Sequence, residues 1–203
     1  MKKIKYALLG EGIAEYEFIP AYLKKIGDFL EFDIQRNRKL QLNNPNKSEV
    51  LKNAQNFCIR SLSDHGDQLF IVGVDLDQTD YLPELEKFIS EKKVVERAIG
   101  KDYKQFQDRV VIFVPIQAID CWLLYQHYRL TNSKKPPPNS LESLPKDEVK
   151  HKVYSKNDGQ HIRKISLQIA EKADFDELAK QSASFSDFHS QVKTFLASLR
   201  PTT

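Results

Sequence analysis

The sequence is poor in cysteine and has no long apolar run, and these two shortages argue against several classes of protein. Its two cysteines, Cys58 and Cys121, lie in apolar surroundings with no partner at metal-ligand or redox spacing. We therefore expect no disulfide framework and a reduced, cytoplasmic location. No apolar stretch approaches the roughly 20 residues that span a bilayer, so no membrane contact is expected. The apolar run near the N-terminus stops at Gly10-Glu11-Gly12, which is too short for a signal peptide and favours a strand.

The charge is balanced over the whole chain but uneven along it. Among 203 residues, 31 Lys and Arg stand against 28 Asp and Glu, and this net charge of +3 does not by itself indicate a nucleic-acid partner. The segment 146–164 is different, because its six basic and three acidic residues give it a charge of +3 (6 − 3) alone. The five histidines are scattered, and none lies at the spacing of a helical metal site.

Strand-like and helix-like segments alternate along the first 130 residues. Continuous apolar runs that end in turns or acids predict buried strands, and helical periodicity predicts helices between them. The expected strands are 3–9, 32–40, 69–74 and 109–114, and the expected helices are 14–29, 48–63 with Ser48 as N-cap, 81–99 and 118–128. This alternation is typical of an α/β fold, in which helices flank a mostly parallel, Rossmann-like sheet of about four strands.

The last third of the chain has a different character. A Pro-Pro-Pro run at 136–138 cannot continue a helix or a central strand, so it marks a linker or insertion. Two residue pairs beyond it are typical of helix N-termini, Asp174 with Glu177 and Ser184 with Asp187. We therefore divide the chain into an α/β core (1–130), a Pro-rich linker or insertion (131–150) and a helical C-terminal part packed on the core (151–203).

Five carboxylates follow the expected strands. Glu11 lies in the turn after the first strand with Glu15 in the next helical turn, Asp75 and Asp77 follow the central strand, and Asp120 follows the last one. The carboxyl ends of parallel strands share one crevice, so these acids are expected to converge. If the central strand continues, its period of two also places Asp75 and Asp77 on the same side.

A divalent cation would resolve the repulsion within such a cluster. Mg²⁺ (or Mn²⁺) prefers oxygen ligands, and two ions about 4 Å apart would stabilise an in-line displacement at phosphorus. Each acid also has a structural explanation, because helix dipoles favour Glu15 and Asp120, and Asp75 and Asp77 could end a strand and cap a helix. Their joint placement at three strand ends favours the metal site.

Several segments resemble the TOPRIM domain family. LLGEGIAEYEFI (8–19) resembles the first TOPRIM motif, and its second glutamate is similar to the version in OLD-type nucleases and their small standalone bacterial relatives. FIVGVDLD (70–77) resembles the DxD motif after the third strand. VPIQAIDCWLL (114–124) resembles the segment after the next strand, where such relatives usually have Glu in place of Asp120, and 154–188 resembles their helical tail. The resemblance spans most of the chain in the same order.

The resemblance implies a TOPRIM-like fold and metal-dependent cleavage of DNA or RNA. It implies Glu11, Asp75 and Asp77 as the metal-binding core, while Asp120 keeps the charge of the usual Glu with a shorter reach. OLD-type nucleases join an ATPase to their TOPRIM domain, whereas this sequence has no G-x-x-x-x-G-K-[ST] loop. By analogy, the implied partner is a separate ATPase subunit, and the implied setting is a bacterial anti-phage defence system.

Basic residues of the segment 146–164 are candidates for contacts with nucleic acid. A fixed positive group near developing charge assists phosphoryl transfer, and Lys156 is the predicted group. Contacts with the phosphate backbone are predicted for Lys150, Lys152, Arg163 and Lys164. All of these side chains could instead be solvated surface charges. Trp122 could stack on a base, but its apolar neighbours favour packing in the core.

Two other functions remain open. Asp75-Leu76-Asp77-Gln78-Thr79 matches the DxDxT motif of haloacid-dehalogenase phosphatases, in which Asp75 would attack phosphorus. That fold opens with the motif and needs a later acidic pair, which the sequence does not supply. The chain could also be a catalytically weak TOPRIM-like scaffold or regulatory subunit of an ATPase complex. The departure at Asp120 is the feature that favours this second alternative.

Overall fold

The sheet holds four parallel strands in the order β2-β1-β3-β4. The computed structural model describes residues 1–43, 45–80, 85–131, 133–156 and 158–200. Within these ranges the strands are β1 (Lys2–Leu9), β2 (Phe32–Arg36), β3 (Leu69–Gly73) and β4 (Val110–Phe113). Every adjacent pair is parallel, so the α/β fold with about four strands that the alternating segments predict is confirmed.

Helices connect the strands and make up the C-terminal part. The described helices are α1 (Ile13–Leu30), α2 (Lys47–Ile59), α3 (Glu86–Ile99), α4 (Asp102–Phe106), α5 (Asp120–Leu130), α6 (Lys146–Tyr154), α7 (Gly159–Lys172), α8 (Phe175–Gln181) and α9 (Ala183–Ser198). The start of the expected helix 81–99 falls on residues 81–84, which lie outside the described residues. α6 begins at Lys146, inside the range 131–150 assigned to the linker. None of the described helices is long and apolar enough to cross a bilayer.

Two helix caps differ from the prediction. Asn46, not Ser48, caps α2, because its extended backbone lets its side chain accept a hydrogen bond from the first helical turn. Ser182 caps α9 in the same way, and the predicted cap Ser184 lies inside the helix. The predicted cap of α8, Asp174, is confirmed.

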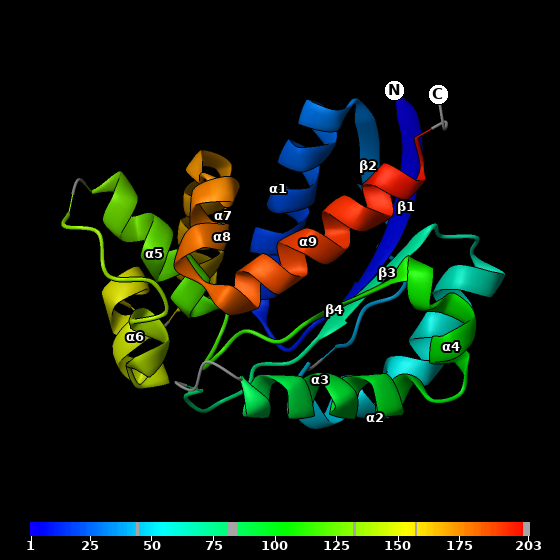
Figure 1. The fold of residues 1–203 in the computed structure, drawn as a ribbon, viewed down its shortest axis with the longest axis horizontal. Coiled ribbons are helices and arrows are strands. Elements are labelled where there is room, and N and C mark those ends of the chain that lie inside the picture. The colour runs from blue at the N-terminus through cyan, green and yellow to red at the C-terminus, as the bar shows by residue number, and fades with distance from the viewer. Residues whose placement is uncertain (44, 81–84, 132, 157, 201–203) are drawn as a thin grey trace.

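Alternate residues of β1 face two hydrophobic cores on opposite sides of the sheet. Tyr6 and Leu8 belong to the larger core, which contains α1, α5 and the C-terminal helices. Ala7 and Leu9 belong to the smaller core, which contains α2 and α3. Figure 1 shows these layers, with α1 and α9 on one side of the sheet and α2 and α3 on the other. Because both faces of the sheet are covered, the strand ends are where polar side chains can gather.

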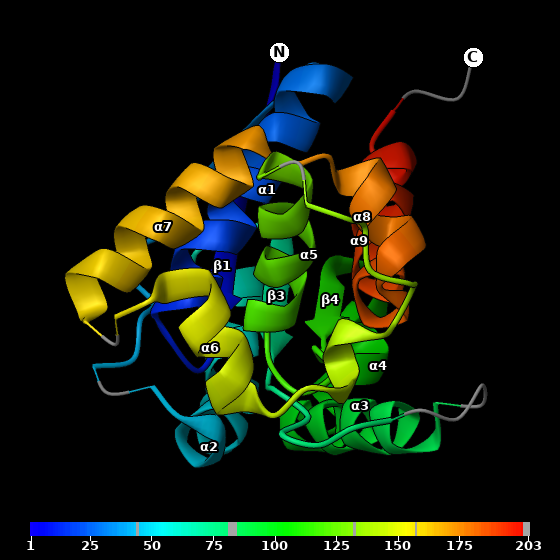
Figure 2. The same ribbon diagram turned by 90° about the vertical axis from the view of Figure 1, so that its left-hand side faces the viewer.

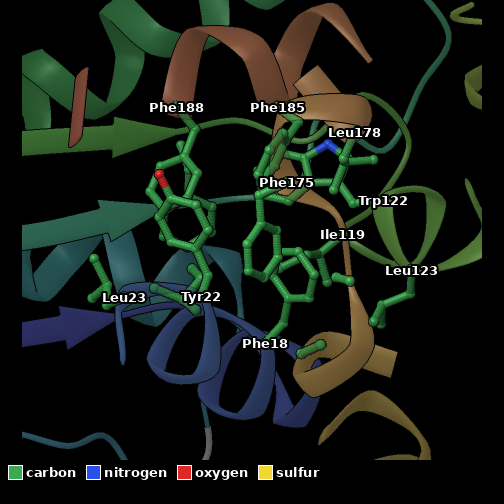
Figure 3. Close-up of a cluster of buried hydrophobic side chains, with 14 of the residues drawn as sticks. Phe18, Tyr22, Leu23, Ile119, Trp122, Leu123, Phe175, Leu178, Phe185 and Phe188 are labelled. Carbon is green, nitrogen blue, oxygen red and sulfur yellow. The ribbon is translucent and has the colours of Figure 1, made fainter. Parts of the chain in front are cut away.

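The larger core joins the C-terminal helices to α1 and α5 through aromatic side chains (Figure 3). Trp122 of α5 lies 5.1 Å from Phe185 of α9, and Phe18 of α1 lies 5.8 Å from Phe175 of α8, between ring centroids. Trp122 is fully buried, and its indole N–H donates to Ser184 at 3.0 Å. The expectation that Trp122 packs in the core is confirmed.

The strand order reverses between β1 and β3. The chain leaves β1 for β2 on one side, then returns to place β3 on the other side of β1. A crevice forms at such a reversal, outside the carboxyl ends of the strands. Leu9 pairs with Val72, so the residues after both strands emerge side by side at this crevice. Figure 2 shows α6 in front of this end of the sheet.

Candidate active site at the strand ends

A cavity of about 510 Å³ occupies the crevice and is lined by charged side chains. The acids that line it are Glu11, Glu15, Asp75 and Asp120, and the lysines are Lys146 and Lys150 of α6. With all six ionised, four negative and two positive charges leave −2, which one divalent cation would balance. We call this space the carboxylate cavity.

Glu11 joins the ends of β1 and β3. Its Oε1 atom accepts a hydrogen bond from the backbone N–H of Asp75 at 2.7 Å. Burial, together with repulsion by the Asp75 carboxylate, raises the pKa of Glu11 to about 7, although this hydrogen bond lowers it. The structure thus brings together two of the predicted metal ligands, which are 64 residues apart.

Asp75 is buried, and both of its carboxylate oxygens are engaged. Oδ1 accepts a hydrogen bond from the backbone N–H of Ile119 at 3.1 Å, and Oδ2 accepts one from the Lys146 ammonium at 2.8 Å. Burial raises the pKa of Asp75 to about 6, and the positive charge of Lys146 opposes this shift. The Ile119 contact ties the end of β3 to the N-terminus of α5, where Asp120 begins the helix.

Glu15 and Asp120 are the most enclosed acids of the carboxylate cavity, with exposed fractions of 3% and 4%. Glu15 lies deep in the site because the first turn of α1 packs against Gly10, where an added Cβ would lie 3.1 Å from the Cβ of Glu15. Burial raises the pKa of Glu15 well above its usual value, and repulsion by Asp75 adds to the shift. Burial also raises the pKa of Asp120, whose Oδ1 accepts a hydrogen bond from the Tyr154 hydroxyl at 2.5 Å.

Asp77 does not share the cavity with Asp75. β3 ends at Gly73, and Asp77 has a left-handed backbone with φ of 59°, so the alternation expected of a continuing strand is lost. Its side chain is 45% exposed and pairs with Lys146 at 2.7 Å and with Lys47 at 3.6 Å. Asp77 therefore lies outside the cavity, and Lys146 pairs with both Asp75 and Asp77.

Lys146 is the residue of the site that the sequence did not single out. Its ammonium lies between Oδ2 of Asp75 and Oδ1 of Asp77, at 2.8 and 2.7 Å. Burial would lower its pKa, but the two ion pairs raise it overall. The only sequence signal was its place in the basic segment 146–164. A second lysine, Lys47 at the start of α2, donates to the backbone carbonyl of Asp75 at 2.7 Å and fixes the same loop.

The other predicted cations are dispersed. Lys150 lines the carboxylate cavity, whereas Lys156 does not and lines a neighbouring cavity of about 210 Å³, which Lys150 and Tyr154 also border. Exposed ion pairs hold Lys152 to Glu148 and Arg163 to Glu17, and Lys164 is exposed on α7. Of the predicted basic residues, the structure therefore places only Lys150 against the clustered acids.

The carboxylate cavity has the oxygen atoms that a divalent cation prefers, but their present arrangement is not that of a metal site. Among the described residues, no group of three His, Cys, Asp or Glu side chains is arranged to hold a metal ion. The Lys146 ammonium instead supplies the positive charge beside Asp75. Carboxylate oxygens are nevertheless the donors that Mg²⁺ prefers, and a bound ion would relieve the repulsion that helps to raise the pKa values of Glu11, Glu15 and Asp75. Binding of an ion at Asp75 would require Lys146 to move away from Asp75. It would also require the Glu11 side chain to turn toward the ion.

The cost of burying Glu15 gives a stability prediction. We expect Glu15→Gln to raise Tm by about 3 °C at about pH 8 in EDTA, because the neutral side chain removes about 1 kcal/mol of the cost of burying a charged carboxylate. Near pH 4.5 the substitution should change Tm little. In the unfolded chain Glu15 ionises near pH 4.3, while the folded protein holds the proton to higher pH, so the wild type loses stability as pH rises through that window. Gln has no such proton. Thermal unfolding across pH measures the effect, with exposed Glu148→Gln as control, and a lower Tm for Glu15→Gln at pH 8 would contradict it.

No family model, curated protein or solved structure matches the chain.

Proposed function

We propose that the protein is a metal-dependent nuclease that hydrolyses phosphodiester bonds of DNA or RNA. The carrying observation is the carboxylate cavity itself, where Glu11, Glu15, Asp75 and Asp120 come from the ends of three strands and face Lys146 and Lys150. Acids alone would repel a phosphate, but a bound divalent cation together with the two lysines would balance their charge. The TOPRIM resemblance of the sequence implies the same chemistry.

The residues divide into metal holders and phosphate binders. Glu11 and Asp75, with Asp120 and Glu15 behind them, would hold Mg²⁺ or Mn²⁺. When bound, such an ion polarises a phosphoryl oxygen and lowers the pKa of a bound water. Lys146 and Lys150 on α6 bind the substrate phosphate and offset the negative charge that develops at phosphorus. Tyr154 holds Asp120 in place through its hydroxyl.

The position of Asp77 favours a ligand role for Asp75 over the nucleophilic role of the phosphatase alternative. Both oxygens of Asp75 accept hydrogen bonds, and either role would need Lys146 to release Oδ2. The Asp77 side chain lies outside the carboxylate cavity, where an acid acting with Asp75 on one phosphoryl group would have to reach. The scaffold alternative is favoured by no contact that the structure describes. A separate ATPase subunit and a role in anti-phage defence remain part of the proposal through the TOPRIM resemblance alone.

A cleavage assay tests the proposal. Labelled single- and double-stranded DNA and RNA are incubated with the protein in Mg²⁺, in Mn²⁺ or in EDTA, and we expect internal cuts only with a metal. Hydrolysis of p-nitrophenyl phosphate is measured in parallel. Phosphatase activity without strand cleavage would favour the alternative centred on Asp75, and inactivity on every substrate, alone and with a co-expressed ATPase, would favour the scaffold.

A further inference from the structure

A second cleft lies next to the carboxylate cavity, between α1, the end of β2 and α7. It has a volume of about 610 Å³, and we call it the α1–α7 cleft. The two helices are side by side (Figure 2) and line both spaces. Glu15 of α1 and Ile162 of α7 line the carboxylate cavity. Tyr16 of α1 and Leu167 of α7 line the cleft. The five-residue step along α7 corresponds to about 7.5 Å of helix.

Arg36, the last residue of β2, is held in this cleft by stacking. Its guanidinium carbon lies 4.5 Å from the centre of the Tyr16 ring. Its Nε and Nη2 atoms are enclosed, and neither has a hydrogen-bond partner in the described part of the chain. Buried donors are almost always paired in folded proteins, because leaving them unpaired is unfavourable. Two N–H donors of Arg36 therefore lack an acceptor among the described residues, and a ligand oxygen would supply one if the side chain turned toward the open part of the cleft.

Tyr16 connects Arg36 directly to the candidate active site. Its hydroxyl donates to the Gly10 carbonyl at 3.2 Å and accepts a hydrogen bond from the Gly10 N–H at 3.3 Å. Gly10 immediately precedes Glu11, so one tyrosine ring separates the guanidinium from the turn that carries a proposed metal ligand. A ligand on Arg36 would lie beside the carboxylate cavity.

The charge of the cleft favours an anion at the Arg36 end. Arg38, which is exposed, lines the cleft beside Arg36. Three acids also line the cleft, but Glu17 is paired with Arg163 and Asp28 with Lys24. The remaining acid, Glu171, is at the other end, where its backbone carbonyl is 3.5 Å from the Lys25 ammonium.

We propose that Arg36 and Arg38 bind a backbone phosphate of the nucleic-acid strand whose reacting phosphate lies in the carboxylate cavity. The planar fork of arginine matches phosphate oxygens in a two-point contact. Because α7 lines both spaces, a strand that lies along this helix can place one phosphate in the carboxylate cavity and a nearby one in the α1–α7 cleft. The inference rests on the proposed nuclease function and adds the path of the substrate, along α7 and away from α6.

Binding measured without cleavage tests the inference. Fluorescence anisotropy of a labelled single-stranded oligonucleotide is followed in EDTA over a series of salt concentrations. We expect Arg36→Gln to weaken binding about tenfold and to reduce the salt slope by about 0.7, the value for one lost phosphate contact on a single strand. Arg36→Lys should restore the slope but not the full affinity, since it keeps the charge and loses the fork. Arg38→Gln, at an exposed position, should act in the same direction with the fold undisturbed.

Arg97→Gln is the matched control, because Arg97 is exposed on α3 on the other side of the sheet. Unchanged affinity and slope in the Arg36→Gln, Arg38→Gln double variant would overturn the inference, while strand cleavage by the wild type would leave the proposed function standing. Inorganic phosphate that bound as tightly as the oligonucleotide, with the same dependence on Arg36, would assign the cleft to free phosphate and also overturn it. If the wild type neither bound nor cleaved nucleic acid, the proposed function would fail as well.

Discussion

Asp75→Asn should reduce metal-dependent cleavage about a thousandfold or more, the largest effect we expect from any single substitution. Asn keeps the shape of Asp75 and can still accept from Ile119, but it loses the charge that a divalent cation needs. Glu11→Gln should have an effect of similar size for the same reason. Initial rates at saturating Mg²⁺, with substrate in excess, measure both losses.

The exposed acid Asp108 provides the control for these two substitutions. Asp108→Asn also removes one negative charge, but from the turn before β4, at the opposite end of that strand from Asp120, so its rate should stay within about twofold of the wild type. Thermal unfolding must show that Asp75→Asn and Glu11→Gln remain folded. Folded variants that cleave as fast as the wild type would show that these carboxylates hold no catalytic metal, and the nuclease proposal would fail.

Lys146→Met should separate two properties that usually change together. We expect turnover at saturating metal to fall about a hundredfold, because the cation beside the reacting phosphate is lost. The Mg²⁺ concentration for half-maximal activity should fall as well, since Lys146 now neutralises Asp75 at 2.8 Å and competes with a metal for it. Metal titrations of the cleavage rate give both quantities.

Lys156→Met is the matched comparison, because it makes the same change in the same segment. Lys156 was the cation predicted from the sequence, but it lines a different cavity. We expect its variant to keep the wild-type metal dependence and to lose less than about threefold in turnover, as for other exposed charges. A larger loss of turnover for Lys156→Met than for Lys146→Met would return the role to Lys156.

The acidic part of the site was predictable because topology and sequence position determine it together. Glu11 and Asp75 directly follow apolar strands, and parallel strands bring their carboxyl ends to one edge. Asp75 and Asp77 meet on the ammonium of Lys146, but not through the side-chain alternation expected of a continuing strand, because β3 ends at Gly73 and no residue type near it indicates that end. The burial of Glu15 depends on how closely α1 approaches β1, which is a packing property.

The basic part was predictable only as a composition. The segment 146–164 was recognisably basic, but the choice between Lys146 and Lys156 depends on where α6 begins and which face it turns to the sheet. Those features follow from contacts between residues about 70 positions apart, such as Lys146 with Asp75. Local sequence patterns do not predict such contacts. That Nε and Nη2 of Arg36 lack partners among the described residues could not be predicted from sequence for the same reason.

The two signs of charge in the site come from different parts of the chain's architecture. The acids directly follow β1 and β3 or lie in the first turns of α1 and α5, so the sheet and these two helices position them. The lysines belong to α6, a nine-residue helix that starts after Pro145 and ends at the left-handed Ser155. Modularity follows from this division. A related protein could exchange this one short helix for another, and so change substrate preference or lose activity, while the same sheet continued to present the same acids.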